Sequence, residues 1–289
     1  MSYPALQKYF SKLHCTHSAG SNLWTDEQGQ AHGRYFNATL SSAFQTIRSG
    51  AENEVIAYEG YLRSYSSGDQ GLNIWKLLDN AASDDESVEL DRLCRLLHTV
   101  NFYRQPATAN LDLYLSVHSR LLAAVAGNHG MAFRRVLDAL ELPHQSIILQ
   151  LPLITPSQRW VFTHVAENYR RNGFRIGANA GSLEQASDLL DRIHPDSIKI
   201  DIGLANDASL QTSLLQRAER QNCKLIFKRI ETEAQLRALQ NDQQTASPYF
   251  VQGFLFDMPK ANIAIAANPS HATDMRISSI DMPKNSFSI

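Results

Sequence analysis

The 289-residue sequence contains few cysteines, little net charge and no long apolar run. Its three cysteines, Cys15, Cys94 and Cys223, lie far apart and are odd in number. This argues against a disulfide framework and is typical of a protein from a reducing compartment. The formal net charge is −2 at pH 7, so charge gives no general reason to expect direct binding to nucleic acid or to an anionic membrane.

Segments that would direct the chain to a membrane are also missing. No apolar run approaches the ~18 residues that a membrane span requires, and the N-terminus, Met1-Ser2-Tyr3-Pro4, lacks the charged and apolar regions of a secretion signal. These absences predict a soluble, cytoplasmic protein without a membrane partner.

Two small groups of cysteine and histidine could contribute metal ligands. One is His14-Cys15-Thr16-His17, and the other is Cys94 with His98 on one face of a predicted helix. A closed zinc site normally takes a CxxC-type or HxxxH-type pair from each side, and neither is present. We therefore interpret these side chains as ordinary core and surface residues, and we expect no metal site and no cofactor.

The periodicity of apolar residues predicts alternating strands and helices. In the second half, strands are predicted at 147–151, 174–178, 197–202, 224–228 and 249–253, and helices at 157–172, 183–193, 207–221 and 233–240. Alternation at intervals of about 25 residues indicates parallel strands joined by crossover helices. The first of these strands is not followed by a Gly-rich phosphate loop, which favours a closed barrel over an open dinucleotide-binding sheet.

The first half predicts an antiparallel opening to the same barrel. Strands at 37–47 and 55–65 are separated by a turn, followed by a helix at 88–102 and a strand at 111–117. Residues 24–30 suggest a small hairpin or an irregular cap. We expect an N-terminal extension over residues 1–36, a barrel over 37–266 and a flexible C-terminal tail over 267–289.

Four short segments occur in the order and at the spacing of the signature strand ends of a known barrel family. They are Glu59-Gly60-Tyr61-Leu62-Arg63, Ile198-Lys199-Ile200-Asp201, Ile230-Glu231-Thr232 and Val251-Gln252-Gly253-Phe254-Leu255-Phe256. They resemble the EAL family of cyclic di-GMP phosphodiesterases, and the resemblance covers roughly residues 36–260. It implies a TIM-like (β/α)8 barrel of the α/β class with an antiparallel first strand, in a bacterial signalling protein.

The resemblance also implies roles for individual residues. Glu59 matches the glutamate that opens the EAL triplet, and Arg63 matches an arginine that contacts the nucleotide phosphate. Lys199 matches the catalytic lysine, and Gln252 matches the glutamine of the closing QG motif. Glu231 matches the second glutamate of the AEGVE segment.

The other positions of the family's metal site differ in this sequence. Ser116 replaces an asparagine, and Gln150 replaces a glutamate. Asn179 and Ala180 replace the two aspartates of the DDFG loop, and Lys228 replaces the first glutamate of the AEGVE segment. Magnesium and manganese bind hard anionic oxygens, and a two-metal site needs several carboxylates. An ammonium ~4 Å from a cation would cost on the order of 4 kcal/mol at an effective dielectric of ~20. We therefore expect vestigial active-site positions, without catalytic residues and without phosphodiesterase activity.

Three functions remain compatible with these residues. We favour a non-catalytic regulator that binds an unidentified regulatory protein. The alternatives are a metal-independent cyclic di-GMP receptor, in which Arg63 and Gln252 bind the nucleotide, and a weakly active phosphodiesterase. The charged survivors also have a structural interpretation, in which Glu59 pairs with Lys228, or Glu231 with Lys199, to fill the emptied mouth of the barrel.

Overall fold

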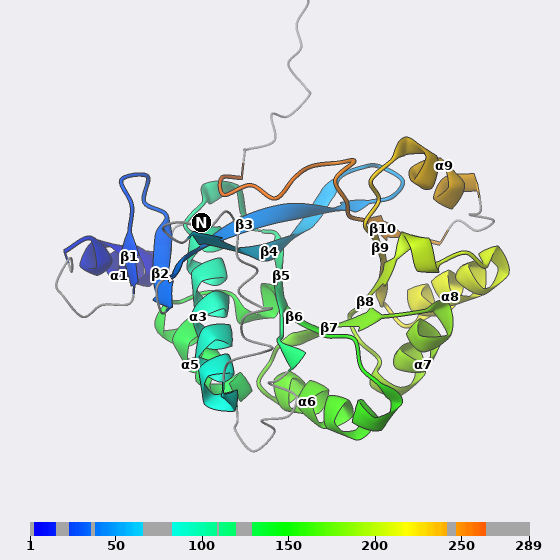
Figure 1. Cartoon of the computed structure of the whole chain (residues 1–289), viewed down its shortest axis with the longest axis horizontal. Coiled ribbons are helices and arrows are strands. Elements are labelled where there is room, and N and C mark those ends of the chain that lie inside the picture. The colour runs from blue at the N-terminus through cyan, green and yellow to red at the C-terminus, as the bar shows by residue number, and fades with distance from the viewer. Residues whose placement is uncertain are drawn as a thin grey trace, which may run out of the picture.

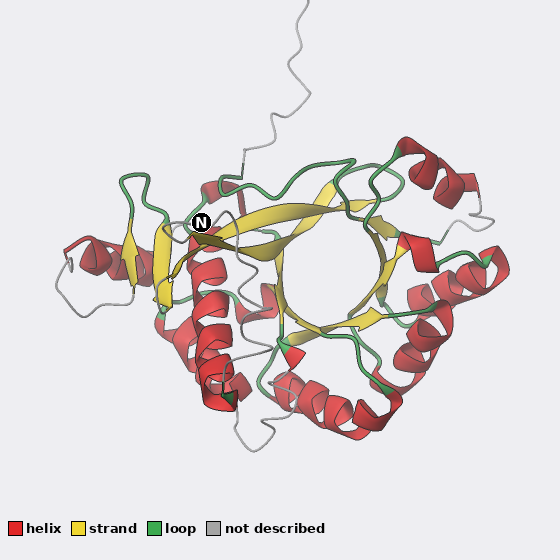
Figure 2. Ribbon diagram, viewed as in Figure 1, coloured by secondary structure: helices red, strands yellow, loops and turns green. Residues whose placement is uncertain are grey.

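The strands of the chain join into a closed barrel, and helices pack around its outside (Figure 1; Figure 2). The computed structural model describes residues 3–15, 23–35, 38–65, 83–108, 110–119, 129–241 and 247–263. The barrel strands are β3 (Ala38–Ser49), β4 (Val55–Tyr65), β5 (Asp112–Ser116), β6 (Ile147–Leu151), β7 (Arg175–Ala180), β8 (Ser197–Asp201), β9 (Lys224–Lys228) and β10 (Phe250–Val251). This arrangement confirms the predicted α/β barrel.

The barrel closes through its antiparallel strand. Neighbouring strands from β4 to β10 pair in parallel, in chain order, whereas β3 pairs antiparallel with both β4 and β10. The strand predicted at 249–253 is shorter in the structure, because the backbone turns at Gly253, whose carbonyl accepts hydrogen bonds from Phe256 and Asp257.

Five helices of the barrel lie at predicted places, and a sixth, α5, was not predicted. They are α3 (Asp84–Tyr103), α5 (His129–Ala139), α6 (Arg159–Arg171), α7 (Leu183–Ile193), α8 (Ala208–Arg220) and α9 (Glu233–Asn241). Local sequence explains their starts: Ser83 and Glu86 form a capping box on α3, and the side chains of Ser182 and Asp207 accept backbone N–H groups at the starts of α7 and α8. No helix in the described ranges is long and apolar enough to cross a membrane.

The N-terminal residues form a helix and a hairpin that join the barrel sheet. After α1 (Pro4–Cys15), strands β1 (Leu23–Thr25) and β2 (Ala31–Tyr35) pair antiparallel, and β2 then pairs with the start of β3. The buried amide of Asn101 on α3 bonds both backbone groups of Ala31, at 2.7 and 2.8 Å. Of the two forms expected at 24–30, the structure has the hairpin. The tail predicted at 267–289, and Thr16 and His17 of the cysteine–histidine cluster, lie outside the described residues.

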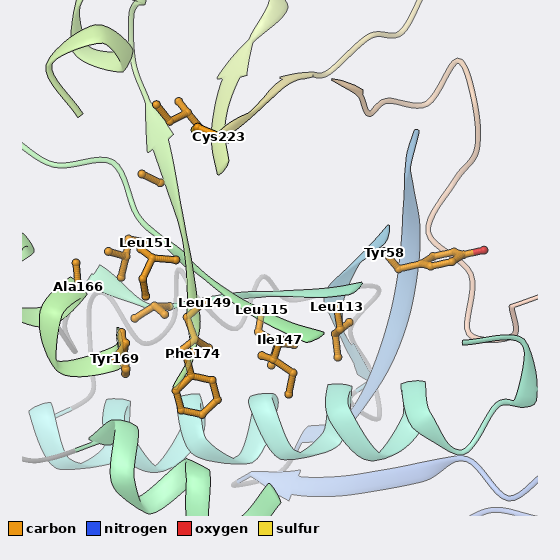
Figure 3. Close-up of a cluster of buried hydrophobic side chains, with 14 of the residues drawn as sticks. Tyr58, Leu113, Leu115, Ile147, Leu149, Leu151, Ala166, Tyr169, Phe174 and Cys223 are labelled. Carbon is orange, nitrogen blue, oxygen red and sulfur yellow. The ribbon is translucent and has the colours of Figure 1, made fainter. Parts of the chain in front are cut away.

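Alternation along each strand divides the buried side chains into two layers. The outward layer fills the space between strands and helices, and Figure 3 shows part of it, with Leu113, Leu115 and Ile147 lying above α3. The inward layer is a separate apolar cluster inside the barrel, built on Ile47, Ala57, Tyr114, Ile148 and Ile226. The inward residues beyond this cluster, toward the carboxyl ends of the parallel strands, form the mouth of the barrel.

Candidate functional site

Polar side chains that the sequence singled out lie together at the mouth of the barrel. Strand register places Ser116 beside Gln150, Asn179 beside Lys199, and Asp201 beside Lys228. These positions alternate with outward-facing apolar residues, so each side chain points toward the barrel axis. Strand order and period therefore bring together residues from β4 to β10.

Glu59 is the centre of a buried hydrogen-bonded network. Its Oε2 atom accepts from Lys199 Nζ at 2.9 Å, from Gln252 Nε2 at 2.9 Å and from the Tyr61 hydroxyl at 2.7 Å. Lys199 Nζ also donates to Gln252 Oε1 at 3.2 Å. The side chains of Glu59 and Lys199 are only 10% and 1% exposed. These groups satisfy one another, as buried polar groups must.

The charges of this network depend on one another. Burial raises the pKa of Glu59, but the Lys199 ammonium and the hydrogen bonds from Lys199, Tyr61 and Gln252 outweigh burial, so the pKa is lowered from 4.5. Burial lowers the pKa of Lys199; Glu59 offsets part of this effect, and the Lys228 ammonium adds to it. The Glu59 carboxylate is therefore ionised at neutral pH and already holds an internal cation.

The sequence predicted ion pairs between Glu59 and Lys228 or between Glu231 and Lys199. This prediction is wrong, because the buried ion pair joins Glu59 to Lys199. Lys228 ends β9 and donates instead to Asn179 Oδ1 at 3.0 Å. Glu231 lies beyond the end of β9 and is exposed. Its distance from the strand end keeps it away from the buried network.

Two cationic side chains extend from the end of β9. No carboxylate in the described part of the chain forms an ion pair with Lys228. The next residue, Arg229, donates to Asp201 Oδ2 at 3.0 Å and has a left-handed backbone with φ of 63°. A glycine stands at this place in the AEGVE segment, and left-handed backbone is a conformation that glycine adopts without strain.

Gln150 and Ala180, which stand at two metal-binding positions of the family, lie in different layers of the barrel. Gln150 is buried inside the barrel, and both polar atoms of its amide lack a hydrogen-bond partner among the described residues. Ala180 pairs with Ile200 on the outward face and packs in the layer between barrel and helices. Of the two positions that match the DDFG aspartates, only Asn179 therefore points into the mouth.

These donors do not fit a pair of dications. No group of three or more His, Cys, Asp or Glu side chains comes together within the described ranges. Glu59 is neutralised by Lys199, and the Ser116 hydroxyl lies 3.5 Å from its other oxygen. Dications favour several anionic oxygens, whereas this mouth offers a paired carboxylate, neutral amides and ammonium groups. Recognition of an anion suits these groups better than binding of a metal.

A pocket of about 480 Å³ opens beside the Glu59 network. It is lined by Gln45, Tyr61, Lys228, Arg229, Glu231, Gln252, Gly253, Phe254 and Pro259. Arg63 is not in this lining; it is exposed and donates to the Pro259 carbonyl at 3.0 Å. The structure thus uses Arg63 to hold the loop after β10, and places Gln252 in both the network and the pocket wall.

Several residues of this site were not predicted from the sequence. Tyr61 was named there only as part of the segment from Glu59 to Arg63, yet its hydroxyl bonds both Glu59 and Gln45. Two signals were available: Tyr61 follows Glu59 by two residues and so shares its face, and Gln45 lies opposite Glu59 across the β3–β4 hairpin. Arg229 and Phe254 lie in loops, for which strand periodicity gives no signal.

Residues 34–259 match the model of the EAL domain. Similar structures include the Bacillus subtilis YkuI protein, with an EAL domain, in complex with cyclic di-GMP and calcium (20% identity, TM-score 0.62, 78% of this chain and 57% of that one). A Klebsiella pneumoniae BlrP1 complex with manganese and cyclic di-GMP has 19% identity and a TM-score of 0.62, over 76% of this chain and 56% of that one.

A standalone EAL protein from Vibrio cholerae O395, bound to cyclic di-GMP, has 16% identity and a TM-score of 0.56, over 76% of this chain and 92% of that one. The chain spans just over half the length of the YkuI and BlrP1 chains. At these identities the structures show a shared fold. Comparison with curated proteins found no match. Because the family match extends from β2 to the loop after β10 and contains the whole mouth, the chain belongs to the EAL-domain family.

Proposed function

We propose that this chain is a non-catalytic EAL-domain protein that acts in cyclic di-GMP-related signalling by binding a regulatory protein. One observation carries the proposal: the Glu59 carboxylate already accepts hydrogen bonds from Lys199, Gln252 and Tyr61. The structures of YkuI and of the Vibrio cholerae protein, both in complex with cyclic di-GMP, support the signalling context.

Electrostatics at the mouth support the absence of catalysis. Metal-assisted hydrolysis needs dications that activate water and stabilise the leaving oxygen. Here a dication would have to displace Lys199 from Glu59 and approach the Lys228 ammonium, which repels it. Tyr61 adds a further obstacle, because its hydroxyl covers the same carboxylate oxygen.

We expect no turnover of cyclic di-GMP. Purified protein incubated with the dinucleotide and excess magnesium or manganese yields linear product at the rate of a protein-free control, measured by chromatography. The single variants Lys228→Glu and Gln150→Glu remain inactive, because a two-metal centre works as a unit and its parts are not additive. Linear product above the control that disappears in Glu59→Gln would overturn the proposal.

A metal-independent cyclic di-GMP receptor is the second candidate, favoured by the Lys228 ammonium, which lines the pocket and forms no ion pair with any described carboxylate. A receptor would release heat on calorimetric titration, chelator would leave that heat unchanged, and Lys228→Met would weaken binding by about 1.5–3 kcal/mol. For a protein-binding regulator we expect no heat and no thermal shift at near-millimolar dinucleotide. Chelator-insensitive heat would favour the receptor.

A further inference from the structure

The pocket at the mouth presents one cation, Lys228, that has no carboxylate partner among the described residues. Lys228 Nζ donates to the neutral Asn179 carbonyl at 3.0 Å. The neighbouring cation, Arg229, is paired with Asp201, and Lys199 is paired with Glu59. Glu231 is the acid in the pocket lining, and no ion pair joins it to Lys228 in the described part of the chain. The pocket is therefore suited to a single negative charge.

Apolar side chains stand beside this cation. Tyr61 is 37% exposed and Phe254 is 53% exposed, and Met258, on the same loop as Phe254, is 55% exposed. Tyr61, Phe254 and Pro259 line the pocket and make part of its wall apolar, and Met258 directly precedes Pro259 in the chain. Exposed apolar groups collected beside a polar site are typical of an interaction surface.

The loop that carries Phe254 and Met258 is held in place by hydrogen bonds. Gln45 Nε2 donates to the Asp257 carbonyl at 2.9 Å, and Arg63 donates to the Pro259 carbonyl at 3.0 Å. Backbone groups of Lys260 and Phe44 also bond in both directions. A loop fixed in this way lowers the cost of ordering its backbone when a partner binds to its apolar side chains.

We infer that this pocket docks a segment of a partner protein that carries one carboxylate side chain flanked by apolar side chains. The inference deepens the proposed function and rests on it. The carboxylate binds the Lys228 ammonium, and its apolar neighbours pack on Tyr61, Phe254 and Pro259. A cyclic dinucleotide has two phosphates and fits less well, because the other cations of the pocket are paired and Glu231 repels a second negative charge.

Peptides of defined chemistry test this inference. The probe is a set of fluorescent octapeptides with one Glu or Asp flanked by Leu, Phe or Met, each beside its Gln or Asn counterpart, titrated by fluorescence polarisation. We expect acid-containing members to bind and their amide counterparts to bind at least ~10-fold more weakly, because a charge-assisted hydrogen bond is lost. Lys228→Met removes this difference, and Lys228→Arg keeps it.

Matched controls separate the site from general charge and folding effects. Lys8→Met removes an exposed lysine on α1 and leaves the preference for the acid unchanged. Phe254→Ser, at an exposed position, weakens acid and amide peptides alike. The inference is overturned by equal binding of acid and amide peptides, by a preference that survives Lys228→Met, or by no binding at millimolar peptide. These outcomes are independent of turnover, so failure of the docking site and failure of the proposed function are distinguishable.

Discussion

Replacing Lys199 with methionine is expected to lower the free energy of unfolding by about 3–5 kcal/mol at pH 7, measured by chemical denaturation. The ammonium is buried and lies 2.9 Å from the Glu59 carboxylate. Without it, an ionised carboxylate stays inside the barrel with Tyr61, Gln252 and, at 3.5 Å, the Ser116 hydroxyl as its donors among the described residues. Breaking a buried pair from one side leaves the full desolvation penalty of the other charge.

Two measurements test this explanation. The double variant Glu59→Gln with Lys199→Met removes both charges and recovers most of the lost stability. The half-buried Lys228, replaced by methionine, provides a lysine control with a loss of about 1 kcal/mol or less. A double variant as unstable as the single one would show that lost packing, and not the unpaired carboxylate, causes the effect.

The loss of unfolding free energy caused by Lys199→Met becomes smaller as the pH falls. In the native chain the pKa of Glu59 is below 4.5, so its stabilising contribution is present above pH 4.5 and is lost as the pH falls through the lowered value. In the variant, burial without a cation raises the pKa of Glu59, and protonation relieves the penalty. Denaturation curves of the two proteins are therefore closer together at pH 4 than at pH 7.

The second large effect is expected for Gly253→Ala, with a loss of stability of about 3 kcal/mol. A Cβ atom at Gly253 would lie 2.0 Å from the Ile230 carbonyl oxygen and 2.4 Å from its nitrogen. Ile230 cannot move aside easily, because its N–H bonds the Gln252 carbonyl and its own carbonyl bonds Leu255. The strand end that carries Gln252 and the loop that carries Phe254 would both shift.

Gly203→Ala is the matched control for this substitution. Gly203 is exposed, and a Cβ atom there would meet only the Asp201 carboxylate, at 3.4 Å. The free energy of unfolding of the Gly203→Ala variant should change by less than about 0.5 kcal/mol. If thermal melting shows equal losses for the two glycine variants, backbone contact at Ile230 is not the cause.

The sequence predicts the barrel well because barrel architecture depends on local periodicity. Strands near the predicted places, crossover helices and the antiparallel opening hairpin all appear in the structure. The same periodicity identifies which strand residues point inward, and so brings Ser116, Gln150, Asn179 and Lys199 to the mouth.

The partners of those residues could not be predicted in the same way. Whether Glu59 pairs with Lys199 or with Lys228 depends on the height of each side chain along the barrel axis, which depends on strand stagger. Alternation along β7 shows why the neighbouring residues Asn179 and Ala180 have different environments: one points into the mouth, and the other packs under the helices. The pocket itself depends on loop geometry after β9 and β10, which has no period.

The N-terminal hairpin changes the edge properties of the sheet. A closed barrel has no edge strand, but β2 continues pairing from the start of β3, and β1 follows with β2 as its one neighbour among the described strands. In general, a strand at the edge of a sheet can template the addition of another chain. Here β1 has only three residues, and short edge strands offer too few hydrogen bonds to hold an added strand. The brevity of β1 thus limits how many hydrogen bonds an added strand could form at this end of the sheet.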